Sequence, residues 1–294
     1  MNVIVCVKQV PDTNIALEVD PQTGAINSDD LVYIVNPCDW LAVEEAARLK
    51  EEGKARQITL ISLGESSATR ALRSCLALGA DKAILLNDPA FKESDSYATG
   101  VVLSQAIGSL PYDLILCGAR ALDTNAGLVG AVIAEMLGLP LVSEVTHINS
   151  ISDKKLEVQR KLEKGNREVV EVSLPAVLTI EGEAEKTRYA SLPALIDAQM
   201  KQIEELDLKA LGLSPMEVGQ KGSKTQTLGY ALPKPRRKKL FAPDASLSAT
   251  AKIAMLMKGG IQEKKTDFLE GDLKKIAQTL VKMLTEQKLI KLRD

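Results

Sequence analysis

Residues 115–130, ILCGARALDTNAGLVG, join an apolar run to a loop of small residues with one arginine and one aspartate. The apolar run through residue 117 is typical of a parallel strand buried on both faces. From Gly127 onward apolar residues recur at helical spacing. Such a loop can bind phosphate, because N–H groups at a helix N-terminus attract anions and small side chains allow close approach. An ordinary strand-to-helix turn is the alternative interpretation.

Cysteines and one histidine are the other side chains with nucleophilic or metal-binding chemistry. The four cysteines are widely separated and form no CxxC pair, so neither a zinc site nor an iron–sulfur cluster is indicated. Cys6, Cys75 and Cys117 stand among apolar residues and are expected in the core of a protein from a reducing compartment. His147 is expected on a surface or in a hairpin. We therefore predict no catalytic side chain and no metal site.

Length and charge limit the possible classes of protein. The chain has 294 residues, enough for one large domain or two. Its 37 basic and 39 acidic residues leave a formal net charge of -2, which argues against a nucleic-acid partner. The N-terminus has no basic leader before a long apolar stretch, and no window approaches about 18 uncharged apolar residues. These features predict no membrane insertion and a cytoplasmic location.

Apolar runs alternate with helical patterns along the first half of the chain, which predicts an α/β fold with a doubly wound parallel sheet. The expected strands cover residues 2–10, 57–64, 82–88 and 113–117, and the expected helices cover residues 36–53, 66–80 and 94–110. In such sheets ligands bind outside the carboxyl ends of the strands. Four loops can therefore line one crevice, namely residues 8–12, 36–39, 64–68 and 118–130.

The pattern changes beyond residue 145. Alternating apolar and polar residues, interrupted by a turn at residues 164–166, predict an antiparallel hairpin followed by a last strand. No strand is expected after Pro193.

The C-terminal third has little apolar periodicity. Residues 200–245 carry clustered charge and four prolines, so we expect either an arm that lies on another surface or a solvated linker. The segment that begins at Glu270 places apolar residues on one face and predicts a terminal helix. The predicted organisation is a nucleotide-binding α/β domain over residues 1–199, then a C-terminal arm and helix over residues 200–294.

Five ordered blocks carry a family resemblance: CVKQVPDT, NPCDWLAVEEAARLKE, CGARALD, SLPAVLTIE and RYASLPALI. Together they cover roughly residues 1 to 200 and resemble the beta subunit of the electron-transfer flavoproteins. The opening VKQVPDT resembles the electron-bifurcating branch, found in anaerobes, more than the ordinary branch. The resemblance implies a Rossmann-like, adenine-nucleotide-binding fold.

The resemblance also implies cofactors and partners. Members pair with an alpha subunit that carries FAD, and the heterodimer exchanges electrons with a flavin-dependent dehydrogenase of acyl-CoA or lactate type. In the bifurcating branch the beta subunit binds a second FAD, and electrons from NADH are divided between the dehydrogenase and ferredoxin. In the ordinary branch it binds structural AMP. The chain is then a redox subunit of an oxidoreductase complex. A non-redox adenine-nucleotide sensor, which would end near residue 150, is the remaining alternative.

The same resemblance implies a position for the nucleotide. The end of the first strand flanks the adenine or the isoalloxazine, residues 36–39 line the adenine side and residues 63–64 face the ribose. Residues 118–130 cradle the phosphates with backbone N–H groups, and Asp123 fixes the shape of that loop. The implied cofactor-binding residues are Cys6, Lys8, Asn36, Pro37, Cys38, Asp39, Leu63, Gly64, Cys117, Gly118, Ala119, Arg120, Asp123, Thr124, Asn125, Ala126, Gly127, Leu128, Val129 and Gly130.

The phosphate loop departs from the bifurcating pattern. Where that branch usually has threonine and glutamine side chains that can donate to a phosphate, this chain has Ala126 and Leu128. The arginine of the loop has moved by one position, to Arg120, or has been replaced. Backbone contacts survive such changes, so nucleotide binding is expected with either ligand, and the choice between FAD and AMP stays open.

Overall fold

The computed structural model describes residues 1–15, 20, 31–152, 154–182, 187–228, 246–257 and 271–286. The chain divides into two units, Met1–Leu232 and Pro233–Asp294. Residues 229–245, which belong to the predicted arm, lie outside the described residues.

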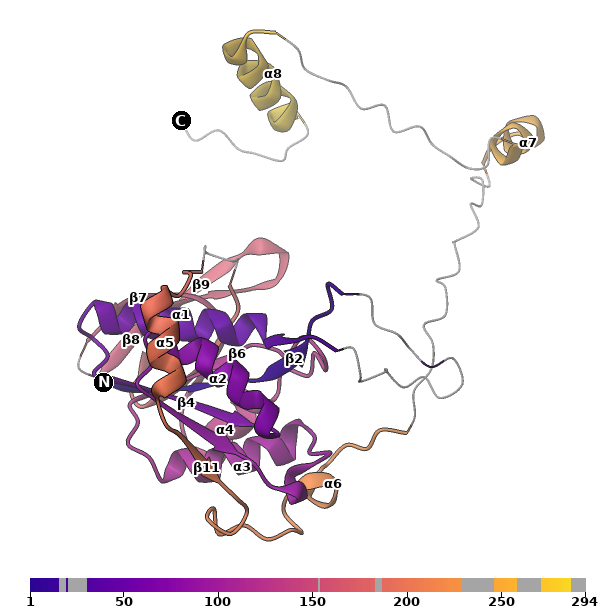
Figure 1. The fold of residues 1–294 in the computed structure, drawn as a ribbon. Coiled ribbons are helices and arrows are strands. Elements are labelled where there is room, and N and C mark those ends of the chain that lie inside the picture. The colour runs from indigo at the N-terminus through magenta and orange to yellow at the C-terminus, as the bar shows by residue number, and fades with distance from the viewer. Residues whose placement is uncertain are drawn as a thin grey trace. The chain divides into compact units, whose positions relative to one another are not determined.

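A nine-stranded sheet forms the centre of the first unit (Figure 1). Its strands follow the order β11-β5-β4-β1-β6-β10-β7-β8-β9. Neighbouring strands from β11 to β7 pair in parallel, and β8 and β9 pair antiparallel. The strands are β1 Asn2–Cys6, β4 Gln57–Leu63, β5 Lys82–Leu86, β6 Leu114–Gly118, β7 Leu141–Ile151, β8 Lys155–Lys161, β9 Arg167–Ser173, β10 Ala176–Ile180 and β11 Ile203–Leu206. A separate antiparallel pair joins β2 Gln9–Pro11 to β3 Tyr33–Val35.

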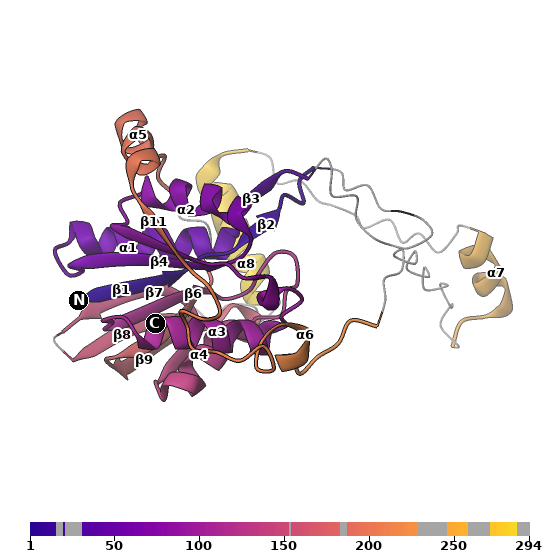
Figure 2. The same cartoon turned by 60° about the horizontal axis from the view of Figure 1, so that its bottom comes forward.

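Helices cover both faces of the sheet, with α1 and α2 on one side and α3 and α4 on the other (Figure 2). The helices of the first unit are α1 Pro37–Glu51, α2 Thr69–Leu76, α3 Ser96–Gly108, α4 Val129–Leu137, α5 Leu192–Met200 and α6 Gly219–Gly222, with 3-10 turns η1 Ser66–Ala68, η2 Pro89–Phe91 and η3 Glu163–Gly165. The second unit contains α7 Ala249–Met257 and the predicted terminal helix, α8 Leu273–Glu286. No helix in the described part of the chain is both long and apolar enough to cross a membrane.

Strand β1 shows why the sheet is buried on both faces. Val3 and Val5 belong to the core cluster under α1 and α2, whereas Ile4 and Cys6 belong to the cluster under α3 and α4. Because successive side chains point to opposite faces, a strand between two helical layers must be apolar at every position. The predicted doubly wound parallel sheet with an antiparallel hairpin is confirmed.

The order of the strands places a switch point beside β1. From β1 the chain moves outward through β4 to β5, then returns to β6 on the opposite side of β1. Where the direction of winding reverses, the loops at the carboxyl ends of the two central strands diverge and leave a crevice. The crevice is therefore expected between the ends of β1 and β6.

The prediction that no strand follows Pro193 is wrong, because β11 extends the sheet beside β5. Ile203 and Leu206 pack against the two core clusters, while Glu204 and Glu205 between them are exposed. Two apolar residues at the ends of a four-residue segment form no recognisable period, so the strand depends on its pairing with β5. The first part of the predicted arm thus packs on the sheet.

Candidate functional site

A cavity of about 1320 Å³ opens at the carboxyl ends of β1, β4, β5 and β6. Most of the residues proposed from the sequence meet there. The predicted residues on its wall are Cys6, Lys8, Asn36, Asp39, Leu63, Gly64, Cys117, Gly118, Ala119, Arg120, Thr124, Ala126, Gly127, Leu128 and Val129.

Other predicted residues do not line the cavity; these are Pro37, Cys38, Asp123, Asn125 and Gly130. Asp123 nevertheless contacts a residue of the cavity wall, because its carboxylate accepts hydrogen bonds from Lys8 Nζ at 2.6 and 2.8 Å. The same carboxylate accepts from the Thr124 N–H at 2.8 Å, which gives this loop part of its shape.

The cavity wall has two parts, one that the sequence predicts and one that it does not. We call residues 36–39 and 118–129 the near wall, because the sequence predicts both segments. Residues 87–99 and 220–228, which also contribute to the lining, are the far wall. Loop 87–99 follows β5 at the same edge of the sheet, and that position could have indicated it. Residues 220–228 carry no ligand-binding signal of their own.

A buried carboxylate joins the two central strands at the near wall. Asp39, only 6% exposed in the first turn of α1, accepts hydrogen bonds from the Lys8 N–H at 2.7 Å and the Gly118 N–H at 3.1 Å. Burial raises the pKa of Asp39 to about 7, although the hydrogen bonds from Asn36 and the two backbone N–H groups act to lower it. The carboxylate therefore connects the ends of β1 and β6.

Asn36, the N-cap residue of α1, also holds a loop of the near wall in place, here residues 118–129, which we call the phosphate loop. Its buried side chain donates to the Arg120 carbonyl at 2.9 Å and accepts from the Leu122 N–H at 2.9 Å. Asn36 and Asp39 line the cavity, yet their polar groups bind the protein's own backbone. Their effect on a ligand would therefore be indirect, because they hold the loop in position.

Three glycines in the near wall or directly after it are required by packing or by backbone conformation. A Cβ atom at Gly118 would lie 2.1 Å from Asp39 Oδ1, and one at Gly130 would lie 2.5 Å from Thr179 Cγ2. Gly127 has a φ of +64° in the left-handed region, which favours glycine. Packing against the protein and backbone conformation therefore explain these residues.

The backbone of the phosphate loop has the features of an anion site. Asn125 and Gly127 both take left-handed conformations, and backbone turns of this kind can present N–H groups to an anion. Helix α4 begins two residues later, at Val129. The first N–H groups of a helix have no partner within it and carry partial positive charge.

The positive charges of the basic side chains on the cavity wall are largely compensated by acidic neighbours. Each lysine or arginine that the described structure places on the wall forms an ion pair with an acidic residue. The pairs are Lys8–Asp123, Arg120–Glu181 and Lys92–Glu65, with N···O distances of 2.6, 2.5 and 2.9 Å. An anion in this cavity would therefore be held mainly by backbone N–H groups.

Cysteines form the floor of the cavity at the strand ends. Cys6, Cys75 and Cys117 are buried free thiols, and their predicted place in the core is confirmed. A side-chain hydrogen bond with Cys117, together with burial, raises the pKa of Cys6 well above its ordinary value. The Cys6 thiol is thus uncharged at neutral pH. His147 lies exposed on β7, in agreement with its predicted surface position.

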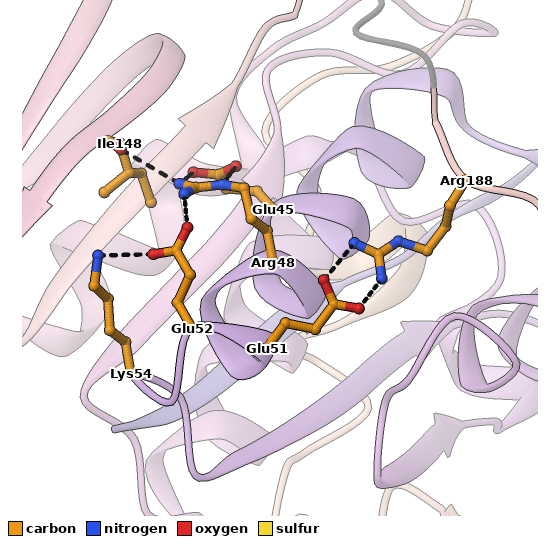
Figure 3. A network of polar contacts seen from close by, with 7 residues as sticks. All are labelled: Glu45, Arg48, Glu51, Glu52, Lys54, Ile148 and Arg188. Carbon is orange, nitrogen blue, oxygen red and sulfur yellow. Dashed lines mark hydrogen bonds and ion pairs between the residues drawn. The ribbon is translucent and has the colours of Figure 1, made fainter.

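An ion-pair network covers the outer face of α1 (Figure 3). Arg188 donates to Glu44 at 2.7 Å and to Glu51, and so connects the segment before α5 to α1. Arg48 pairs with Glu45 at 2.6 Å. Glu44 and Glu45 are both half-buried, and each is paired with an arginine.

Fold and cavity together define a doubly wound α/β protein with a cavity at its topological switch point. The chain matches the family model described as the electron transfer flavoprotein domain over residues 23–211. It therefore belongs to the electron transfer flavoprotein family. A match that extends to residue 211 does not fit the sensor alternative, which would end near residue 150.

Similar proteins specify the subunit. The chain is 40% identical over 238 residues to the electron transfer flavoprotein subunit beta of Thermoanaerobacterium thermosaccharolyticum, covering 81% of this chain and 90% of that protein. It is 40% identical over 227 residues to the caffeyl-CoA reductase-Etf complex subunit CarD of Acetobacterium woodii, with coverages of 77% and 86%. Protein FixA of Azotobacter vinelandii is 35% identical over 246 residues, with coverages of 81% and 86%. The resemblance to beta subunits is confirmed.

Proposed function

We propose that the chain is an electron transfer flavoprotein beta subunit whose cavity binds FAD. Paired with an alpha subunit, it passes electrons between NADH, ferredoxin and a partner dehydrogenase by flavin-based electron bifurcation. Relatives named as subunits of caffeyl-CoA reductase and acryloyl-CoA reductase complexes support a flavin-dependent partner of the acyl-CoA class, with the lactate class as the other candidate.

The extent of the cavity is the observation that carries the proposal. An adenosine monophosphate at the near wall would lie between residues 36–39 and the phosphate loop. The cavity continues beyond that loop to residues 87–99 and 220–228. This additional space accommodates the second half of a dinucleotide such as FAD, so it favours FAD over AMP.

The residues present suit a bound dinucleotide. Backbone N–H groups of the phosphate loop and of the first turn of α4 would hold the pyrophosphate. Asn36 and Asp39 keep the loop in place, and the buried side chains of Cys6 and Cys117 form the floor of the cavity. A bound flavin supplies hydride and single-electron transfer, and the protein supplies its position and its electrostatic surroundings.

Structural AMP is the second candidate. Ala126 and Leu128 stand on the cavity wall without side chains that could donate to a phosphate. The basic residues of the wall are already paired. A ligand with one phosphate needs fewer donors than a dinucleotide, and this observation favours AMP.

Nucleotide analysis of the purified heterodimer distinguishes the candidates. Co-expressed with its alpha subunit, the chain should yield two FAD molecules per heterodimer on extraction and chromatography. With the partner dehydrogenase and its oxidised substrate added, NADH should reduce ferredoxin, and it should not do so without them. One FAD and one AMP per heterodimer would instead assign the chain to the ordinary branch.

We propose that the C-terminal region contacts the alpha subunit. Its basic run, residues 234–239, lies outside the described residues and is proposed to meet an acidic patch on the alpha subunit. Trypsin should cut this run in the isolated chain and spare it in the heterodimer. Equal cleavage in both samples would contradict the assignment.

A further inference from the structure

One carboxylate, that of Asp95, joins two segments of the far wall. Its Oδ1 accepts from the Ala98 N–H at 2.9 Å and caps α3. Its Oδ2 accepts from the Lys224 N–H, the Thr225 N–H and Thr225 Oγ1, each at 2.8 Å. The N–H of Asp95 donates to Ser223 Oγ at 2.9 Å. The two oxygens thus have separate tasks, one in the helix and one in a segment about 130 residues away in sequence.

That segment, residues 223–228, borders the cavity, and we call it the strap. Residues 225–228 of the strap line the cavity, and so do Asp95 and Thr99 at the start of α3. The carboxylate therefore closes one side of the wall by holding the strap against the start of α3.

The two ends of the strap differ in how firmly they are held. Before it, Val218 is only 1% exposed, and a Cβ atom at Gly219 would lie 2.3 Å from the Ala90 carbonyl oxygen. At its far end Leu228 is 95% exposed. The strap can therefore move about its packed start, with the contacts of Asp95 at residues 223–225 opposing the movement.

The charge state of Asp95 strengthens these contacts. Partial burial acts to raise its pKa, but the hydrogen bonds from Ala98, Lys224 and Thr225 prevail and lower the pKa below its ordinary value. The side chain is thus ionised at neutral pH, and hydrogen bonds to an ionised acceptor are stronger than neutral ones. Lys224 Nζ also lies 5.0 Å from the centre of the Tyr97 ring, a second contact between the strap and α3.

We propose that Asp95 is a positioning residue that keeps the strap closed over the cavity and thereby slows the exit of a bound nucleotide. The inference rests on the proposed function in so far as the cavity binds a nucleotide. The closure itself rests on the hydrogen bonds alone.

Variants can separate the two tasks of the carboxylate. Asp95→Ser keeps an oxygen that can cap α3 but removes the acceptor of the strap. Thr225→Val removes one donor of the strap, and Thr225→Ser restores that hydroxyl. Asp207→Ser is the matched control, because Asp207 likewise accepts from a nearby backbone N–H, that of Ala210 at 2.7 Å, and lies outside the cavity wall.

Nucleotide release is the first measurement. The full chain in complex with its alpha subunit is freed of nucleotide at this cavity, loaded there with radiolabelled FAD and chased with excess unlabelled FAD. We expect release to be about tenfold faster in Asp95→Ser and about threefold faster in Thr225→Val, since each loses hydrogen bonds to a charged acceptor. Thr225→Ser and Asp207→Ser should match the wild type. Equal release from Asp95→Ser and the wild type would overturn the proposal.

Trypsin cleavage after Lys224 tests closure without a nucleotide. Mass spectrometry should show this bond cut about tenfold faster in Asp95→Ser than in the wild type or Asp207→Ser, because the carboxylate no longer holds the backbone. If the wild type binds no labelled FAD at this cavity, the proposed function fails while the cleavage ratio still decides closure. Unchanged cleavage in both Asp95→Ser and Thr225→Val would overturn closure itself. Should Asp95→Ser fail to fold, Thr225→Val carries both tests.

Discussion

The near and far walls of the cavity are each organised by an aspartate near the start of a helix, but the two carboxylates lie in different surroundings. Asp39 is buried and joins the ends of two central strands. Asp95 is half-buried and joins α3 to the strap. Their pKa values shift in opposite directions, up for Asp39 and down for Asp95.

The difference shows that a buried contact mainly affects the stability of the domain, whereas a contact at the edge mainly affects the rate of ligand exchange. Contacts of Asp39 belong to the core, so their loss should weaken the whole domain. Contacts of Asp95 lie at an edge that can open while the sheet stays intact, so their loss should mainly change rates of opening. The following experiments test this division.

Gly118→Val should have the largest effect. Its Cβ atom would meet Asp39 Oδ1 at 2.1 Å and the Asp39 backbone nitrogen at 2.9 Å, which forces the carboxylate away from both of its backbone donors. We expect the free energy of unfolding to fall by about 3 kcal/mol, measured by urea denaturation. Nucleotide binding should be lost with it.

A matched glycine separates this effect from a general cost of added side chains. A Cβ atom at Gly108 in α3 would lie 3.7 Å from Leu137 Cδ2, an ordinary contact. Gly108→Ala should change the unfolding free energy by less than about 1 kcal/mol. Similar losses in both variants would show that Asp39 does not explain the requirement at Gly118.

The pH dependence of stability should reveal Asp39. Its folded-state pKa of about 7 lies above the ordinary aspartate value of about 3.9, so its contribution is complete below that lower value and is lost as pH rises through 7. Relative to Asp39→Asn, the wild type should lose roughly 2 kcal/mol of unfolding free energy between pH 5 and pH 8. Parallel pH profiles for the two proteins would contradict a raised pKa.

Asp95 should respond to pH in the opposite sense. Because its folded-state pKa is lowered, its contribution is present above the ordinary value and is lost as pH falls through the folded-state value. Hydrogen exchange should show protection of the Lys224 and Thr225 amides in the wild type at pH 6 that disappears in strong acid. Asp95→Ser should show little protection at either pH, and a wild-type pattern in that variant would argue against the contact.

Lys8→Gln should have the smallest effect. Lys8 pairs with Asp123 at the partly exposed rim, and such ion pairs contribute little. We expect a change of less than about 1 kcal/mol in unfolding free energy and less than about threefold in nucleotide affinity. A much larger loss of affinity would show that the lysine, in addition to the backbone of the phosphate loop, binds the phosphate.

Local sequence patterns determined the layered fold and the near wall. Continuous apolar runs such as residues 114–117 specify strands buried on both faces, because a polar side chain there would lose its hydration. Asn36 and Pro37 mark the start of α1, and loop 118–128 follows its strand directly. Each of these signals lies within a few residues of the structure that it specifies.

Only the tertiary structure decided what those residues contact. Asp39 could be recognised in sequence near a helix start, but its bond to Gly118 spans 79 positions. Strand β11 and the strap carry no local period and acquire their conformations from β5 and Asp95. A contact between segments more than 100 residues apart forms when the sheet brings them together, so its partners cannot be read from the pattern of either segment alone.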